Sequence, residues 1–205
     1  MNRPLILVDP TGLQAGTPIN VEITVPEAKV YINEKINDGK KDKYFSGVGA
    51  IITIKLTDAE GRPLSGATVS ESNVRKAGSG SINENKGVFP LGESGEIRDI
   101  VGKGEITDTP QTDTTEDDVP GVTEYFNSTP FTSTTEQTLT VKTSDGGIYN
   151  VVTERTITNV GKDGKLNTDL NGNGLNTVVT VSSAKVTVVR APDPPKSLEP
   201  KMFNQ

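Results

Sequence analysis

The feature that most constrains the fold is a regular alternation of apolar and polar residues, which is clearest in the stretch Ile52–Leu56. Its three apolar residues lie on one face of an extended chain, and Thr53 and Lys55 lie on the other. This alternation is typical of a half-buried strand, and no apolar stripe with helical spacing is found elsewhere. Further strands are predicted at 3–9, 21–25, 29–32, 137–142, 148–158 and 178–189, with shorter ones at 87–89 and 96–98.

The composition supports an all-β chain. Hydrophobic residues make up 32% of the sequence and aromatic residues 4%, and Trp is absent. The core must therefore consist mainly of Val, Ile and Leu, which suffices for two thin sheets whose alternate residues face inward. The 21 Gly and 13 Pro residues, together with many Thr, Asn and Asp, favour frequent turns between short strands.

Charge and residue types exclude several functions. The formal net charge of −6 argues against nucleic acid as a partner, because an acidic chain repels phosphate. No apolar run is long enough for membrane insertion as a helix, and no signal peptide is visible at the start. The absence of His and Cys removes the usual zinc sites, thiol nucleophiles and Ser-His-acid triads. With few aromatics to stack sugars as well, we expect no catalytic residues and no enzyme.

The N-terminal run Leu5, Ile6, Leu7, Val8 is apolar and ends at Pro10 and Gly12. One interpretation is an edge strand of the chain's own sheet, since N-terminal strands are commonly tied down in this way. The other is an assembly strand that completes the sheet of a neighbouring subunit. Both interpretations require that these four side chains be buried against protein.

Two polar stretches are predicted to lie outside the strands. Residues 33–43 read as a loop or hairpin tip, with Asp38-Gly39 as its turn. Residues 102–120 are rich in Thr, Asp and Pro and read as a long surface loop, with irregular sequence continuing to 135. The proline-rich tail, residues 191–205, reads as a linker.

The stretch from Asp58 to Val69 resembles the strand-turn-strand signature of bacterial Ig-like domains, of the invasin/intimin type or the carboxypeptidase-regulatory-like type. Its signature residues are Asp58, Gly61, Pro63 and Gly66. The physical reading agrees, because Asp58 can bond the backbone two residues on, Gly61 can take a positive φ, and Pro63 stiffens the exit. Residues 92–99 and 137–152 are similar to the later turn and the final hairpin of the same domains.

The resemblance implies an Ig-like β-sandwich with an extra N-terminal strand and a long irregular loop. It divides the chain into an N-terminal strand and hairpin at 1–43, the sandwich at 44–190, and the tail at 191–205. It also implies an exported, extracellular or cell-surface protein, because the family serves in spacers, stalks and adhesins. The family has no common catalytic residues, so none is carried over to this chain.

Calcium is the one cofactor for which the sequence holds a candidate site. Asp169, Asn171 and Asn173, followed by Gly174, match the opening of a calcium loop in which alternate oxygens face the ion. The twelfth position is Thr180 rather than Glu, so the bidentate ligand is missing. A hairpin loop rich in Gly and Asn is the favoured interpretation.

Two weaker candidates remain. The acidic run at 113–118, with Asp113, Glu116, Asp117 and Asp118, is favoured as a solvated surface rather than a cation site. Some Gram-positive surface domains of this broad shape carry isopeptide cross-links, which need a buried Lys beside an Asn and a carboxylate. The sequence identifies no such triplet.

The sequence thus favours a structural or adhesive module of a bacterial cell-surface assembly. Its partners are expected to be copies of itself or neighbouring surface domains. In a sharper form it is a pilus-like filament subunit joined by strand addition through residues 3–9. The alternatives are a soluble ligand-binding or calcium-binding β-sandwich domain, and a phage or virion decoration domain.

Overall fold

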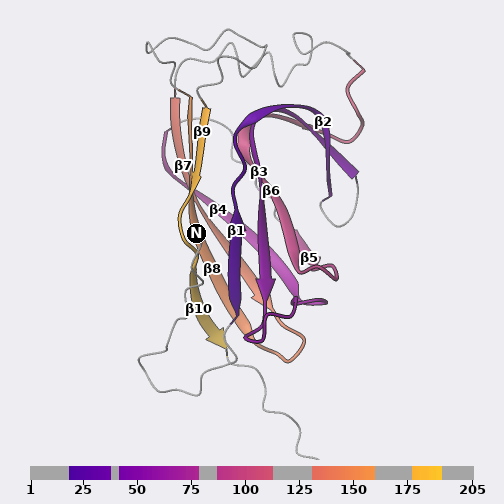
Figure 1. Ribbon diagram of the computed structural model, residues 1–205, viewed down its shortest axis with the longest axis vertical. Coiled ribbons are helices and arrows are strands. Elements are labelled where there is room, and N and C mark those ends of the chain that lie inside the picture. The colour runs from indigo at the N-terminus through magenta and orange to yellow at the C-terminus, as the bar shows by residue number, and fades with distance from the viewer. Residues whose placement is uncertain (1–18, 38–41, 79–86, 113–130, 160–176, 191–205) are drawn as a thin grey trace, which may run out of the picture.

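The computed structural model describes residues 19–37, 42–78, 87–112, 131–159 and 177–190. In these ranges the chain forms ten strands and no helix, so the all-β prediction is confirmed. The strands make two antiparallel sheets that face each other as a sandwich, elongated along the strand direction (Figure 1).

The first sheet is organised around β3 (Asp42–Thr57), the longest strand. One side of β3 pairs along most of its length with β6 (Glu96–Thr107). The other side pairs with two shorter strands in turn, β1 (Asn20–Thr24) near its end and β2 (Lys29–Asn37) near its start. Because both run antiparallel to β3, β1 and β2 act as one edge strand that is interrupted around Pro26.

The second sheet has β7 (Phe131–Lys142) and β8 (Ile148–Asn159) at its centre, joined by a tight turn. The predicted Asp145-Gly146-Gly147 turn is confirmed, with Gly146 at a φ of 88°. β4 (Thr68–Ala77) pairs with the free side of β7, and β5 (Val88–Pro90) extends the sheet briefly beyond β4. β9 (Thr177–Val181) and β10 (Lys185–Arg190) pair with the other side of β8.

The main core fills the space between the two sheets. It is built from Ile, Val and Leu on alternate positions, as the composition predicts. Ile52, Ile54 and Leu56 are fully buried and supply the inward face of β3. Val69, Val141 and Val151 meet them from the second sheet. At about 1.5–3 kcal/mol for each fully buried side chain, this apolar layer is the main stabilising contribution.

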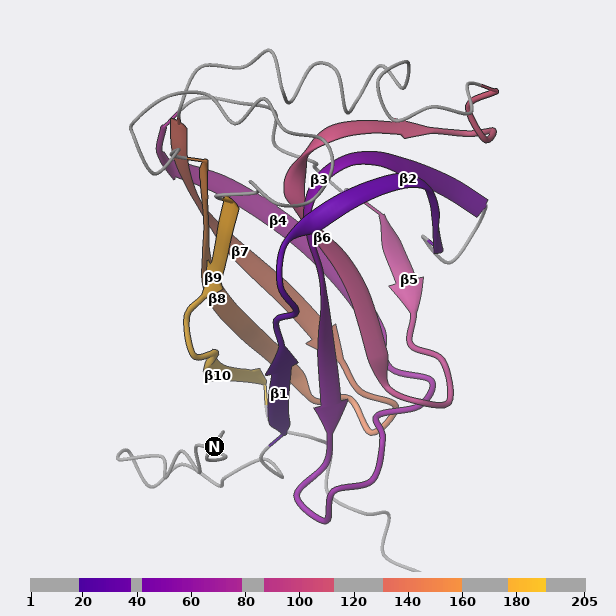
Figure 2. The ribbon, with the colours of Figure 1, turned by 45° about the horizontal axis from the view of Figure 1, so that its top comes forward.

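A second apolar cluster lies on the opposite face of β3. Phe45 is fully buried there beside Tyr31 and Ile51. Gly47 and Gly104 face each other across β3 and β6, and a Cβ added to Gly104 would lie 2.3 Å from the Ser46 carbonyl oxygen. The glycines let the two backbones lie close beneath the Phe45 ring. In Figure 2 this part of β2, β3 and β6 curves away from the second sheet.

The expected loop at 102–120 is wrong for residues 102–107, which continue β6. The sequence did not predict this part of β6, because Gly102 and Gly104 have no side chains that could show the alternation. Irregular backbone begins at Asp108, and the strand β7 already starts at Phe131. Of the predicted loop at 102–135, residues 102–107 belong to β6 and residues 131–135 to β7.

Two other boundaries differ from expectation. Residues 33–37 belong to β2, and Asn37 pairs with Asp42, so the hairpin of β2 and β3 is longer than predicted. The single strand predicted at 178–189 is two strands, β9 and β10, separated at 182–184. There Ser182 inserts its hydroxyl, which accepts a hydrogen bond of 2.8 Å from the Glu154 N–H. β1 and β2, expected within a segment 1–43, both pair with β3 of the sandwich.

The turn after β3 has the geometry that its sequence predicts. The Asp58 carboxylate accepts hydrogen bonds from the N–H groups of Glu60 at 3.0 Å and Arg62 at 2.8 Å. Gly61 has a φ of 81° and Gly66 a φ of 76°, so both use the left-handed region. Pro63 forms an isolated bridge to Thr57, which returns the chain toward the sheet.

Candidate functional site

A layer of polar side chains interrupts the apolar core between the two sheets. Glu71 on β4, Gln137 on β7 and Arg155 on β8 come from the second sheet, and Asp99 on β6 comes from the first. All four occupy positions whose alternate neighbours are core residues, such as Val69, Ile97 and Leu139. Burying polar groups costs free energy unless they are hydrogen-bonded, so this layer is the candidate functional site.

Arg155 links the two sheets. Its side chain is only 6% exposed, and its guanidinium forms an ion pair with the Asp99 carboxylate, which is 19% exposed. The same guanidinium donates a hydrogen bond to the amide oxygen of Gln137. Asp99 is further held by the N–H of Ile100 at 2.8 Å. Breaking such a buried pair leaves an uncompensated charge inside the protein.

Gln137 lies at the centre of the cluster and is completely buried. Its amide nitrogen donates to the Glu71 carboxylate at 2.7 Å and to the Asp99 carboxylate at 2.7 Å. With its oxygen bound by Arg155, the amide has a charged partner at each end. The amide is therefore fixed in one orientation and is strongly polarised.

The electrostatics of the cluster centre on Glu71. Burial and, to a smaller extent, the neighbouring Asp99 carboxylate raise the pKa of this carboxyl to about 7. Hydrogen bonds from Asn73 and Gln137 and the charge of Arg155 act in the opposite direction. Because two carboxyl groups lie beside one guanidinium, the cluster can bind one more proton near neutral pH.

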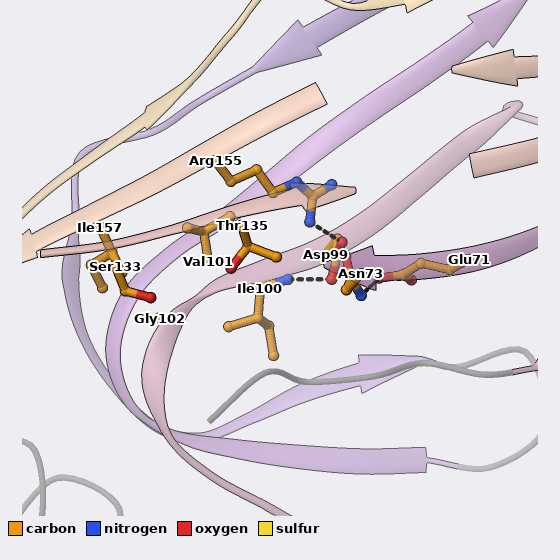
Figure 3. Close-up of a pocket in the computed structure, with 10 residues that line it drawn as sticks. All are labelled: Glu71, Asn73, Asp99, Ile100, Val101, Gly102, Ser133, Thr135, Arg155 and Ile157. Carbon is orange, nitrogen blue, oxygen red and sulfur yellow. Dashed lines mark hydrogen bonds and ion pairs between the residues drawn. The ribbon is translucent and has the colours of Figure 1, made fainter. Parts of the chain in front are cut away.

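A small pocket of about 60 Å³ opens beside the cluster. Figure 3 shows Asp99, Asn73 and Glu71 gathered at one end of it, with Ser133 and Ile157 at the other. This volume holds a few water molecules and not a sugar or a nucleotide. The site is therefore suited to chemistry among its own side chains and bound water.

Two buried polar atoms next to the cluster have no hydrogen-bond partner among the described residues. They are the Thr153 hydroxyl and the Nε of Arg155. Thr153 is 1% exposed and lies directly opposite Gln137 in the pairing of β7 with β8. An unsatisfied buried hydroxyl is rare enough to call for an explanation.

Sequence reasoning did not find this cluster, although a signal was present. The predicted strand 137–142 places Leu139 and Val141 inward, and the same alternation places Gln137 inward too. Likewise the strand 148–158 places Thr153 and Arg155 on the face of Val151. Inward-facing polar residues on two adjacent strands mark a buried polar site. Glu71 and Asp99 joined it only through the three-dimensional fold.

The sequence-predicted candidates do not coincide with this cluster. The assembly residues Leu5, Ile6, Leu7 and Val8 lie outside the described residues, as do the calcium candidates Asp169, Asn171 and Asn173 and the acidic run 113–118. The signature turn with Asp58, Gly61, Pro63 and Gly66 lies at the end of the sandwich and shapes the fold.

In the described ranges, no group of three or more acidic residues is arranged to hold a metal ion. No Lys is among the buried side chains of those ranges, so the Lys-Asn pair of an isopeptide bond is not found in them. Arg155 is the buried cation of the cluster, and a guanidinium is a poor nucleophile because it stays protonated.

Comparisons with protein-family models, with curated proteins and with solved structures found no match for the chain. The described ranges contain no helix that is long and apolar enough to cross a membrane.

Proposed function

We propose that the chain is a structural or adhesive module of a bacterial cell-surface assembly. In this proposal it is an extracellular filament subunit, joined to copies of itself or to neighbouring surface domains by strand addition, and not an enzyme. The support comes from the Asp58–Val69 resemblance, from the two-sheet architecture, and from an edge of the second sheet that carries exposed valines and pairs with no further strand among the described residues.

The observation that carries the proposal is the exposure of Val188 on β10. Val188 pairs with Tyr149, whose side chain is buried in the main core, so Val188 also faces inward. It is nevertheless 45% exposed, because it sits at the edge of the sheet. In the described residues β10 pairs only with β8, which leaves the other edge of β10 without a partner strand. A strand added there would cover Val188 and complete the backbone ladder.

The run Leu5–Val8 is a donor of suitable chemistry. It supplies four consecutive apolar residues, which suit a strand covered on both faces. Donation to a second copy requires only that residues 3–9 of one subunit reach β10 of the next.

Electron microscopy and size-exclusion chromatography with light scattering test this. The unaltered chain should form polymers or oligomers, and removal of residues 1–10 should give monomers with the same β-sheet circular dichroism spectrum. Val188→Lys should block assembly from the acceptor side, because a charge replaces an inward-facing apolar group. Thr187→Lys, on the opposite face of the same strand, is the matched control and should still assemble. A truncated chain that still polymerises would contradict the proposal.

A further inference from the structure

The pairing of Thr153 with Gln137 has a chemical consequence that does not depend on the proposed assembly. The two residues are directly opposite on β8 and β7, and both side chains point into the sandwich. Thr153 is 1% exposed and Gln137 is 0% exposed, so bulk water is excluded from both. The Thr153 hydroxyl has no hydrogen-bond partner among the described residues. A nucleophile and a carbonyl group are therefore carried by directly opposite residues, away from bulk water.

The Gln137 amide is arranged as an electrophile. Arg155 donates to its oxygen, which withdraws electrons from the carbonyl carbon and would stabilise negative charge on that oxygen. The carboxyl groups of Glu71 and Asp99 both lie at hydrogen-bond distance from its nitrogen, at 2.7 Å each. Acyl transfer needs these two elements: a cation at the developing oxyanion and proton carriers at the leaving group.

We propose that Thr153 and Gln137 join in an intramolecular ester, formed within the folded chain. The Thr153 Oγ1 attacks the Gln137 Cδ, the Cδ–Nε2 bond breaks, and ammonia leaves. The hydroxyl proton passes through the carboxyl groups to the departing nitrogen, so one alcohol and one amide give one ester and one ammonia. No oxidant, metal or cofactor is consumed.

Each neighbouring residue has a role in this step. The Asp99 carboxylate, paired with Arg155, accepts the hydroxyl proton. Glu71, whose pKa burial raises to about 7, is available in its protonated form to protonate the amine as it leaves. The Arg155 guanidinium holds the oxyanion of the tetrahedral intermediate. Glu71, Asp99 and Arg155 already contact the Gln137 amide, and the Thr153 hydroxyl must turn toward that amide to react.

The geometry of a β-ladder accommodates the product. The Cβ atoms of directly opposite residues lie roughly 4.5–5.5 Å apart in an antiparallel pair. In the ester, one oxygen and two carbons separate the Thr153 Cβ from the Gln137 Cβ, which spans about the same distance. The bond would lock β7 to β8 covalently at the level of the polar cluster.

Intact-mass spectrometry of the purified full chain tests the proposal. The chain should be lighter than its sequence mass by one ammonia molecule. Trypsin should then release residues 104–142 and 143–155 as one branched product, because Lys103, Lys142 and Arg155 are the flanking cleavage sites. Mild alkali should separate the two peptides by hydrolysing the ester.

Substitutions locate the bond. Thr153→Val keeps the side-chain shape but removes the hydroxyl, and it should restore the full sequence mass. Thr153→Ser retains a hydroxyl and should still lose ammonia. Thr158→Val, on the outer face of the same strand, is the matched control and should remain cross-linked. Glu71→Gln should slow or abolish the reaction, because it removes one proton carrier.

Two outcomes would overturn the proposal. The first is a folded unaltered chain that retains its full sequence mass after prolonged incubation at neutral pH. The second is a loss of ammonia that persists in Thr153→Val. This second result would identify a succinimide at Asn171-Gly172 or Asn173-Gly174, which has the same mass change, and fragmentation of residues 104–155 distinguishes the two.

Discussion

Gly95 shows how one backbone conformation fixes the start of a strand. It precedes β6 with a φ of 66°, and its carbonyl oxygen accepts a 2.9 Å hydrogen bond from the N–H of Leu56. A Cβ added to Gly95 would lie 2.6 Å from the Leu56 carbonyl oxygen. Both the left-handed conformation and the close approach therefore require glycine at this position.

We expect Gly95→Ala to lower the free energy of unfolding by about 2 kcal/mol or more, since the left-handed conformation alone costs roughly 1–2 kcal/mol for a residue with a Cβ. Gly92→Ala in the same turn is the control, because a Cβ there meets nothing within 4 Å. Urea denaturation of both variants measures the difference. Equal stability of the two variants would show that the turn does not constrain Gly95.

Glu71 gives a prediction about pH. Its pKa in the folded chain is about 7, above the ordinary value of 4.5 that applies when the chain unfolds. Between these values the folded state binds the extra proton, so the free energy of unfolding falls as the pH rises through that window. The contribution of this group is present below about pH 4.5 and is lost by about pH 7, with an upper size of about 3 kcal/mol.

The comparison that isolates this effect is the difference between Thr153→Val and the double variant Thr153→Val/Glu71→Gln, because neither chain can form the ester. The double variant cannot titrate at this position, so its stability should decline less between pH 4.5 and 7.5. Denaturant midpoints at several pH values measure the two slopes. Parallel slopes would mean that Glu71 titrates alike in the folded and unfolded states.

At the level of elements, the glycine contacts between β3 and β6 explain why residues 102–107 are a strand. Gly47 pairs with Gly104 and Gly49 pairs with Gly102, and the Phe45 ring lies over this surface. The strands are held by backbone approach and by one aromatic ring rather than by alternating apolar side chains. A pattern of side chains could not reveal such a strand.

We expect Gly104→Ala to destabilise the fold by about 1–3 kcal/mol, the usual cost of overpacking, because the added Cβ meets the Ser46 carbonyl oxygen and the Phe45 ring. Glu105→Ala changes the neighbouring exposed residue and should have little effect. Hydrogen exchange should show the loss of protection first in β2 and the paired ends of β3 and β6. Uniform loss of protection over both sheets would argue against a local cause.

At the scale of the whole molecule, the described strands form one connected structure. β1 and β2 pair with β3, which also contributes Ile52, Ile54 and Leu56 to the main core. The ion pair of Asp99 with Arg155 joins the two sheets a second time through polar groups. Residues 19–37 therefore have no separate core of their own in the described structure.

Thermal or urea unfolding should accordingly show one transition. Circular dichroism reports on the sheets as a whole, and tyrosine fluorescence reports on Tyr31 in β2 and Tyr149 in β8, among others, without interference because the chain has no Trp. The two signals should have the same midpoint. An earlier transition in fluorescence that is lost in Tyr31→Phe would show that β2 unfolds on its own.

The sequence by itself determined the all-β class, most strand positions and the geometry of the Asp58 turn. These follow from local causes: side-chain alternation has a period of two, and Asp, Gly and Pro act on the backbone within a few residues. The alternation around Leu139 and Val151 also indicates that Gln137, Thr153 and Arg155 face inward, although none of them was among the predicted site residues.

Only the tertiary structure decided that these three residues meet Glu71 and Asp99. Asp99 comes from the other sheet and Glu71 from a strand 66 residues away from Gln137 in the chain. Such a meeting depends on which strands pair and which faces oppose, and no local pattern encodes that. The tertiary structure also decided that β6 continues through Gly102 and Gly104. Glycines at a close backbone approach have no side chains, so they cannot show an alternating pattern.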